Sequence, residues 1–539
     1  MPEISTHTKE LITKYALWKN SKKPQTGAAT IHVDEVASKV AAFYEQIRTI
    51  IDWKEEHLMR RAAIIRKLKR RFFDLELSDF STRNIAEPLV LELIRGGFFP
   101  NDKIETLKIQ EVQNVIEKYV FILRHNPENK KGKTGVRFYN QLLEIAACEI
   151  EETLDPAIRE MALIDFMFAE MRERIFIHED IYKKGLLKKE DADIQIYIAV
   201  QQALFKLDDP IISYNIIRHK YQNWDRATQE ELLKISQNIF GILRGIEKDL
   251  QHPLGQRFYR ICEKYDTPYL LLGDVLAKDN PQKTEQEMQS PPALEGMVRA
   301  AYTKRLADLK VKIRRAAVYS TISIFITKIL SLLILEVILA KLFSGHFDWL
   351  ALAIDVLIPT ILMCLLVAMV KPPSKKNLAI AIMETIKITY EKEKKDVYEI
   401  RPRRKKSVLV RSFLSFIYLL GACVSFGAIF WVFNYFQFPI SSIVINTIFI
   451  ALILFAGTAV QTRSRELTME EETGGFFGFI SDILFLPVTG VGRWLSNTWK
   501  QYNAITAFLN ALIDMPFSTF IEFLEGWRYF IKEKKEEMR

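Results

Sequence analysis

Three charged residues interrupt long apolar stretches of the sequence: Lys328, Glu336 and Asp355. Charges inside such stretches are costly and usually face the interior of a helix bundle. Glu336 lies six residues before the end of one stretch, and Asp355 lies six residues after the start of the next. At about 1.5 Å per residue, both carboxylates lie about 9 Å from the same edge, and Lys328 lies about 12 Å deeper.

This spacing allows a site for a proton or a cation. Two close carboxylates raise each other's affinity for a proton, and a bound cation would relieve their repulsion. The alternative is structural: the three side chains supply packing polarity or reach back to the nearest interface. We favour the structural interpretation and keep the functional site as the alternative.

The rest of the chain offers little chemistry. Gly132-Lys-Thr matches the end of a phosphate-binding loop, but Pro127 stands where that loop needs glycine. The eight histidines and four cysteines show none of the spacings that bind zinc or iron. We therefore expect no metal, no cofactor and no enzymatic activity.

Two runs of cations suggest contact with an anionic surface such as lipid headgroups. The first run holds Arg60, Arg61, Arg66, Lys67, Lys69, Arg70 and Arg71, and the second holds Arg403, Arg404, Lys405 and Lys406. The alternative for the first run is a solvated helix face whose cations complement the helix dipole. Aromatic residues that would stack on single-stranded nucleic acid are not interleaved, so we do not expect a nucleic-acid partner.

The apolar stretches themselves predict four membrane-spanning helices. They cover residues 318–342, 349–370, 413–436 and 440–460, and each is long enough to cross about 30 Å of hydrocarbon. Residues 371–411 carry thirteen Lys and Arg, whereas the links 343–348 and 437–439 carry none. Because cytoplasmic loops are rich in Lys and Arg, both termini and residues 1–317 are predicted to be cytoplasmic. The expected location is the cell membrane, with the lipid bilayer as a partner.

Small and polar residues on the last two stretches predict close helix packing. Gly421 and Ser425 are four residues apart, as in small-xxx-small contact faces, and Asn446 can hydrogen-bond to a neighbouring helix. Such faces serve association within one bundle or between copies of the chain in a homo-oligomer.

Apolar periodicity elsewhere predicts an all-α fold with a helical cytoplasmic domain over residues 31–277. Residues 31–73 read as one long helix with coiled-coil spacing. Further helices are predicted near 86–95, 107–124, 136–153, 156–175, 191–207, 227–250, 253–264 and 267–277. Residues 1–30 are expected to form a flexible tail, 278–293 a polar linker, and 294–317 a basic helix that leads into the first apolar stretch.

The remaining segments are predicted to lie at the inner membrane face. The loop 371–411 is expected to hold one more charged helix there. Residues 475–531 are rich in aromatic side chains and predict amphipathic membrane-surface helices, interrupted at Pro487 and Pro516. A fifth span or re-entrant segment at 475–491 is the less favoured alternative. Residues 532–539 form a charged tail.

Composition and organisation favour a binding function. The chain has 539 residues and a net charge of +9, and four cysteines exclude a disulfide-stapled secreted framework. More than half of the chain is predicted to be cytoplasmic and helical. We therefore expect a membrane-anchored scaffold or adaptor that holds a protein partner through residues 31–277. The alternative is a small-solute or ion transporter or channel subunit that uses Lys328, Glu336 and Asp355.

Overall fold

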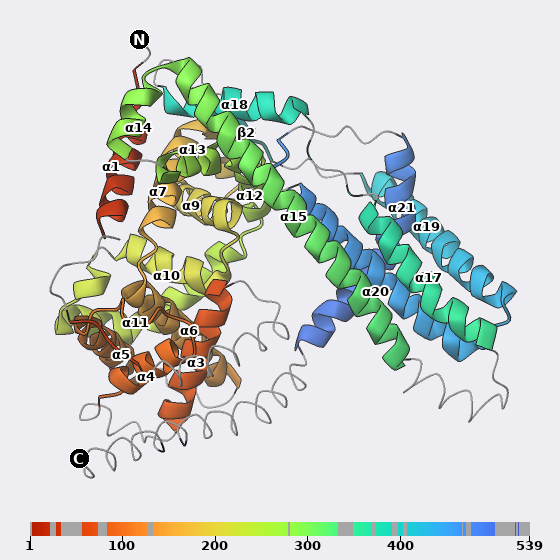
Figure 1. Ribbon diagram of the computed structural model, residues 1–539, viewed down its shortest axis with the longest axis horizontal. Coiled ribbons are helices and arrows are strands. Elements are labelled where there is room, and N and C mark those ends of the chain that lie inside the picture. The colour runs from red at the N-terminus through yellow and green to blue at the C-terminus, as the bar shows by residue number, and fades with distance from the viewer. Residues whose placement is uncertain are drawn as a thin grey trace, which may run out of the picture.

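The computed structural model describes residues 3–21, 29–33, 56–73, 84–126, 133–221, 223–278, 281–331, 349–368, 370, 373, 375–390, 397–402, 407–465, 467–469, 476–501, 523 and 527. Within these residues the fold is all-α, apart from one pair of three-residue strands. Figure 1 shows two bodies, a helical domain and a bundle of long apolar helices, with helix α15 (Pro291–Ser331) running from one into the other.

The helical domain contains most of the secondary structure. Its helices are α1 (Thr6–Ser21), α3 (Glu56–Phe73), α4 (Ala86–Arg95), α5 (Leu107–Arg124), α6 (Lys133–Leu154), α7 (Ile158–Arg174), α8 (Glu179–Lys183), α9 (Lys189–Phe205), α10 (Asp209–Lys220), η2 (Trp224–Arg226), α11 (Gln229–Leu250), α12 (Gly255–Lys264), α13 (Asp266–Lys278) and α14 (Pro281–Met288). The predicted helices 86–95 and 107–124 coincide with α4 and α5. The predictions near α6, α7, α9, α11, α12 and α13 are displaced by three residues or fewer at each end.

Helix α11 illustrates why these segments are helical. The Thr228 side chain accepts a hydrogen bond from the backbone N–H of Glu231, and the Glu231 carboxylate accepts one from the N–H of Thr228. This capping box satisfies two N–H groups that the helix leaves unpaired. Ile235, Ile239 and Leu243 then recur on one face and are buried in the domain core.

The N-terminal region corrects a prediction. Residues 1–30 were expected to form a flexible tail, but α1 packs along α7. Its buried residues Thr8, Leu11, Ile12 and Tyr15 are spaced as one face of a helix. The start of the predicted long helix 31–73 is also wrong, because Ile31 and Val33 are non-helical and the adjacent Thr30 forms a β-bridge with Glu105. Residues 34–55 lie outside the described part of the chain.

The predicted polar linker 278–293 is also partly helical. Helix α14 covers Pro281–Met288, and α15 begins at Pro291. Thr284 and Met288 are buried, and the Tyr390 hydroxyl donates a hydrogen bond to the Met288 carbonyl at 2.6 Å. The few apolar residues of this segment are therefore enough to dock it onto the domain.

The segment between the two predicted helical hairpins folds into the domain. It contains α18 (Lys375–Thr389) and β2 (Tyr398–Ile400), and β2 pairs in parallel with β1 (Ile175–Ile177). Ala381, Ile388 and Ile400 belong to the domain core. The prediction of a charged helix here is confirmed. One face of α18 is apolar and is covered by α13 and α15, and its expected place at the membrane face stays a prediction.

Asn377 ties the domain to the bundle. Its side-chain amide donates to the Tyr302 hydroxyl of α15 at 3.0 Å and to the Leu467 carbonyl, and its carbonyl oxygen accepts from the N–H of Met469 at 2.7 Å. Residues 467–469 directly follow the bundle helix α20 (Ile440–Ser464). Three chain segments thus meet at one buried amide, which we call the Asn377 junction.

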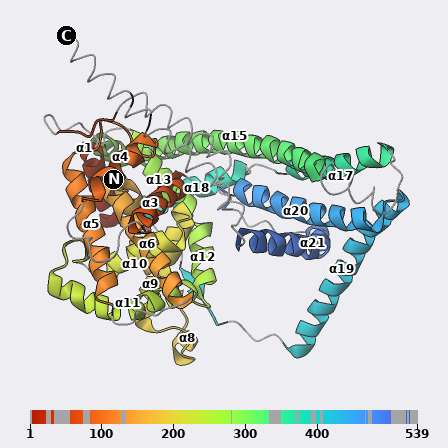
Figure 2. The same ribbon diagram turned by 90° about the horizontal axis from the view of Figure 1, so that it is seen from below.

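The bundle consists of α17 (Trp349–Ala368), α19 (Val408–Tyr435), α20, α21 (Phe476–Gln501) and the second half of α15. Figure 2 shows α20 and α21 side by side, with α19 inclined to both of them. Phe433, Ile450, Leu454 and Val488 form its core. In contrast to the domain, many outward-facing side chains of the bundle are large and apolar.

Two described helices, Val408–Tyr435 and Ser442–Thr462, are long and apolar enough to cross a membrane. Four were predicted. The apolar part of α17 in the described residues is the shorter stretch Ile354–Ala368, and it contains Asp355. The first predicted span, 318–342, is described only to Ser331, as the second half of α15.

Helix α21 corrects the prediction for the first part of the aromatic region 475–531; residues 502–522 and the break expected at Pro516 lie outside the described residues. A membrane-surface helix that breaks at Pro487 was expected. Instead α21 continues through Pro487 and packs along both α19 and α20. A β-carbon built on Gly492 would lie only 2.1 Å from the Ala451 carbonyl oxygen of α20. A glycine at this position therefore permits the close approach that places α21 inside the bundle.

Candidate functional site

The bundle brings two of the three predicted charges together. Lys328 Nζ lies 2.6 Å from Asp355 Oδ2, and both side chains are at most 1% exposed. The Asn446 amide donates to Asp355 Oδ1 and also to the Ser442 carbonyl at 3.0 Å. Lys328 Nζ lies 5.1 Å from the centre of the Phe449 ring, which adds a cation–π contact. The predicted hydrogen bond from Asn446 to a neighbouring helix is confirmed.

The contact between Lys328 and Asp355 was not predicted. Lys328 was expected about 12 Å deeper than Asp355, yet their charged groups are in contact. The flexible stem of lysine carries its ammonium far from the backbone position on which the expectation was based. Glu336 lies outside the described residues, so the predicted approach of Glu336 to Asp355 stays a prediction. The ion pair neutralises the charge that the bundle buries here.

Gly421 and Ser425 contact α21 of the same chain. A β-carbon on Gly421 would lie 2.7 Å from the Ile483 carbonyl oxygen, and Ser425 Oγ donates to the Leu484 carbonyl at 2.7 Å. Pro487 has no N–H, so the carbonyl four residues earlier, that of Ile483, loses its helical partner. The small face of α19 therefore accommodates the irregular turn of α21, and this face is occupied within one chain.

The first basic run is largely engaged inside the domain. Arg60 pairs with Asp155 at 2.9 Å, Arg61 pairs with Asp208 while only 7% exposed, and Lys67 pairs with Glu92 at 2.9 Å. Arg66 is partly buried and Lys69 is exposed. The side chains of Arg70 and Arg71, and all of residues 403–406, lie outside the described part. Contact with an anionic surface stays a prediction for this run, but Arg61 is too buried to take part.

A cavity with charged and aromatic walls lies in the domain, and sequence reasoning missed it. It has a volume of about 550 Å³ and is lined by Lys14, Glu152, Ile158, Met161, Ala162, Asp165, Tyr197, Asn215, Arg218, His219, Tyr221, Trp224 and Asp225. Helices α1, α6, α7, α9 and α10 and the segment around η2 contribute these residues. We call it the α7–α10 cleft.

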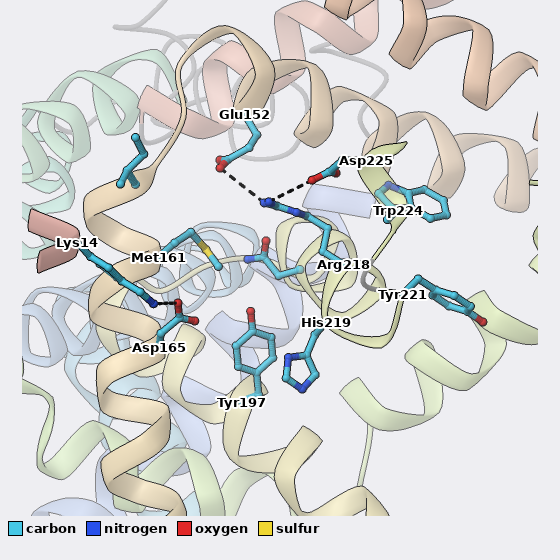
Figure 3. Close-up of a pocket in the computed structure, with 13 residues that line it drawn as sticks. Lys14, Glu152, Met161, Asp165, Tyr197, Arg218, His219, Tyr221, Trp224 and Asp225 are labelled. Carbon is cyan, nitrogen blue, oxygen red and sulfur yellow. Dashed lines mark hydrogen bonds and ion pairs between the residues drawn. The ribbon is translucent and has the colours of Figure 1, made fainter. Parts of the chain in front are cut away.

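Figure 3 shows how the charged walls of the α7–α10 cleft are arranged. Arg218 reaches between two carboxylates, 3.7 Å from Glu152 and 3.4 Å from Asp225. On the other wall, Lys14 pairs with Asp165 at 2.6 Å. All these side chains except that of Glu152 are at least one-third exposed. A ligand in the cleft would therefore meet positively and negatively charged side chains on both walls.

The floor of the cleft is aromatic. The rings of Tyr197 and His219 stack with centroids 4.9 Å apart. Burial raises the pKa of the Tyr197 hydroxyl, so it stays protonated and can donate a hydrogen bond. Burial also raises the pKa of Glu152, although the N–H of Ala157 and the charge of Arg218 oppose this rise.

A buried network holds one wall in place. Trp224 is 2% exposed, and its indole N–H donates to Glu149 Oε2 at 2.9 Å. The Tyr119 hydroxyl donates to the same oxygen at 2.8 Å, and Lys118 pairs with the other carboxylate oxygen. A rigid wall of this kind suits recognition, because a pre-formed site loses less entropy on binding.

A second cavity of about 340 Å³ adjoins the first around the α6–α7 turn, and Glu152, Met161 and Asn215 line both. Its floor is mainly apolar and includes Ile164 and Phe205. Cys148 also lines it, but burial raises the pKa of its thiol to about 12, so it is a poor nucleophile. No group of three potential metal ligands occurs among the described residues. The paired charges and the aromatic floor suit binding rather than covalent chemistry.

The comparisons with known proteins identify no relative. No protein-family model, no curated protein and no solved structure matches the chain.

Proposed function

We propose that this protein is a membrane-anchored adaptor that holds a protein partner in the α7–α10 cleft of its cytoplasmic domain. The cleft carries the proposal, because it combines side chains of opposite charge with an aromatic floor. Its volume falls in the range of about 300–1,000 Å³ that is typical of binding pockets. A segment of a partner protein with both charged and aromatic side chains would match these walls.

The proposed anchor is the apolar bundle. We propose that α15 and α17 cross the membrane together with α19 and α20, and that the domain and both termini lie in the cytoplasm. The exposed surface of α19 is apolar over most of its length, including Phe413, Phe416 and Trp431. With 28 residues, α19 is about 42 Å long, so it fits about 30 Å of hydrocarbon when it is tilted.

The connection between domain and anchor supports a fixed geometry rather than a loose tether. Helix α15 is continuous between the two bodies, and the Asn377 junction adds a second attachment. An adaptor built in this way presents the cleft at a set distance from the membrane.

The test is affinity purification of the full-length tagged protein in mild detergent, followed by quantitative mass spectrometry. The cleft variant Asp165→Lys/Asp225→Lys reverses two exposed carboxylates and leaves the core intact. The control variant Glu10→Lys/Glu190→Lys makes the same charge change at exposed positions that line neither cavity. The proposal requires stoichiometric partners that the wild type and the control retain and the cleft variant loses at least tenfold. A purified protein without partners would contradict it.

The alternative, a transporter or channel subunit, depends on Lys328, Glu336 and Asp355. The contact between Lys328 and Asp355 favours a packing role, because both side chains are buried and each neutralises the other. Flux through reconstituted vesicles that disappears in Asp355→Asn, with the protein still folded, would reverse this preference.

A further inference from the structure

The part of α15 between the two bodies is exposed and basic. Upstream, α15 is docked on the domain through Leu294, Val298, Tyr302 and Leu309, all of them buried. Downstream, Lys328 is buried in the bundle. Between these contacts the helix carries the sequence Lys310-Val-Lys-Ile-Arg-Arg, in which all residues except Ile313 are exposed. The helix is therefore accessible from several sides at this point.

Four cations occupy this exposed stretch: Lys310, Lys312, Arg314 and Arg315. At 100° per residue they point in directions spread over more than half of the helix circumference. We call this group the α15 collar. No acidic residue occurs between Leu309 and Ser331. The nearest acidic residue of α15 is the exposed Asp308, one turn before Lys312, and among the described residues it makes no ion pair with a collar cation.

The pairing of the cations on α15 changes along the helix. Nearer the domain, Arg299 pairs with Glu295 at 2.7 Å, and Arg305 pairs with Asp274 through two hydrogen bonds. The four collar cations make no ion pair with any residue that the structure describes. Unlike Arg61 and Lys67 in the domain, they keep their full charge available for a partner outside the chain.

An exposed apolar surface begins within one turn of the collar. Val318, Tyr319, Ile322 and Ile326 are each about half exposed, at 49–60%. From Arg315 to Val318 the helix rises by about 4.5 Å. If the apolar surface lies in hydrocarbon, the collar lies at the level of the headgroups.

We propose that the α15 collar binds anionic phospholipid headgroups of the membrane leaflet that faces the domain. This proposal rests on the proposed membrane insertion and adds the class of lipid that the anchor would bind. Each Lys or Arg near an anionic membrane surface favours binding by about fivefold, so four cations on one helix give a strong combined preference. The attraction is electrostatic and is weakened by salt.

The experiment uses the full-length protein inserted in vesicles of phosphatidylcholine with phosphatidylglycerol. After extraction in mild detergent, the phosphatidylglycerol that stays with the protein is measured by mass spectrometry. The collar variant replaces Lys310, Lys312, Arg314 and Arg315 by Gln. The control variant replaces Lys183, Lys184, Lys188 and Lys189, four exposed cations on and beside α8 and α9, by Gln.

We expect the wild type and the control to retain phosphatidylglycerol and the collar variant to retain at least tenfold less. Equal retention in wild type and collar variant, or an equal loss in both variants, would overturn the proposal. Insertion into vesicles of phosphatidylcholine alone, measured by flotation, shows that the collar variant is intact. If the wild type does not insert into phosphatidylcholine vesicles, the proposed membrane anchor is wrong. If it inserts but retains no more phosphatidylglycerol than the collar variant, only the lipid-binding proposal is wrong.

Discussion

The helical domain and the apolar bundle both bury a lysine–carboxylate pair, but they surround it differently. In the domain, Glu149 accepts from Tyr119 and Trp224 as well as from Lys118, whose ammonium lies 4.6 Å from the Trp224 ring centre. In the bundle, Asp355 has Lys328 and one amide, that of Asn446. In the domain the Glu149 carboxylate accepts from three side chains, whereas in the bundle the Asp355 carboxylate contacts Lys328 and a single amide. The cost of removing a partner should therefore differ between the two regions.

The largest expected effect is on the bundle pair. Asp355→Ala leaves Lys328 buried without its counter-charge, which should lower the free energy of unfolding by about 3–5 kcal/mol. The measurement is chemical unfolding of the full-length protein in mild detergent, followed by tryptophan fluorescence. The double variant Lys328→Met/Asp355→Leu should recover most of this loss, because it removes both charges. A single variant as stable as the wild type would show that the ion pair is dispensable.

A smaller loss is expected from the domain network. Glu149→Gln keeps the shape of the side chain but turns one accepting oxygen into an NH2 group that cannot accept, so the hydrogen bonds to that oxygen are lost. This should cost about 1.5–3 kcal/mol. The same unfolding measurement checks it. A larger loss of stability in Glu149→Gln than in Asp355→Ala would contradict this expectation. It would show that the carboxylate with more partners is the more sensitive one.

Packing at the α19–α21 contact comes next in size. Gly421→Ala places a methyl group 2.7 Å from the Ile483 carbonyl oxygen and should cost about 1–3 kcal/mol through overpacking. Gly427→Ala is the matched control on the same helix, since nothing lies within 4 Å of the added methyl. Alanine is the better helix former, so the control should be neutral or slightly stabilising. Equal effects of the two substitutions would argue against close contact between α19 and α21.

The smallest effect concerns Asp266, a buried carboxyl at the start of α13. Burial raises its pKa to about 7, and the charge of Lys206 only partly offsets this. In this pH range the folded state holds a proton that the unfolded state has released. The free energy of unfolding should therefore fall by about 1 kcal/mol as the pH rises from about 6 to 7. Asp266→Asn should abolish this slope in unfolding curves recorded across that range; an unchanged slope would assign it to another group.

The sequence predicts the helices of the domain well where apolar periodicity is strong and caps are present. Helix α1 carried such a signal in Leu11, Ile12 and Tyr15, but the polar composition of residues 1–30 obscured it. Helix α10 was missed although Pro210 stands in its first turn, where proline is well tolerated. The strands β1 and β2 are only three residues long and pair across more than two hundred residues, so no local pattern marks them.

The candidate sites also differ in whether the sequence alone reveals them. Lys328, Asp355 and Asn446 are visible in the sequence because polar residues stand out in apolar stretches. The α7–α10 cleft is not, because Lys14, Glu152, Asp165 and Arg218 become neighbours only through tertiary folding. Similarly, Arg61 and an exposed cation look alike in a sequence, and only the position of Asp208 makes Arg61 part of the interior.

The way α18 closes the domain has a consequence for how the chain is made. The Thr8 hydroxyl donates to the Ile388 carbonyl at 3.3 Å, across 380 residues of sequence. At about 5–20 residues per second, a ribosome needs roughly 20–80 s to synthesise that interval. If the proposed insertion holds, the first helical hairpin enters the membrane during this time. The domain that comes first in the chain is thus completed only by a segment that emerges after insertion has begun, so correct insertion becomes a precondition for a finished domain.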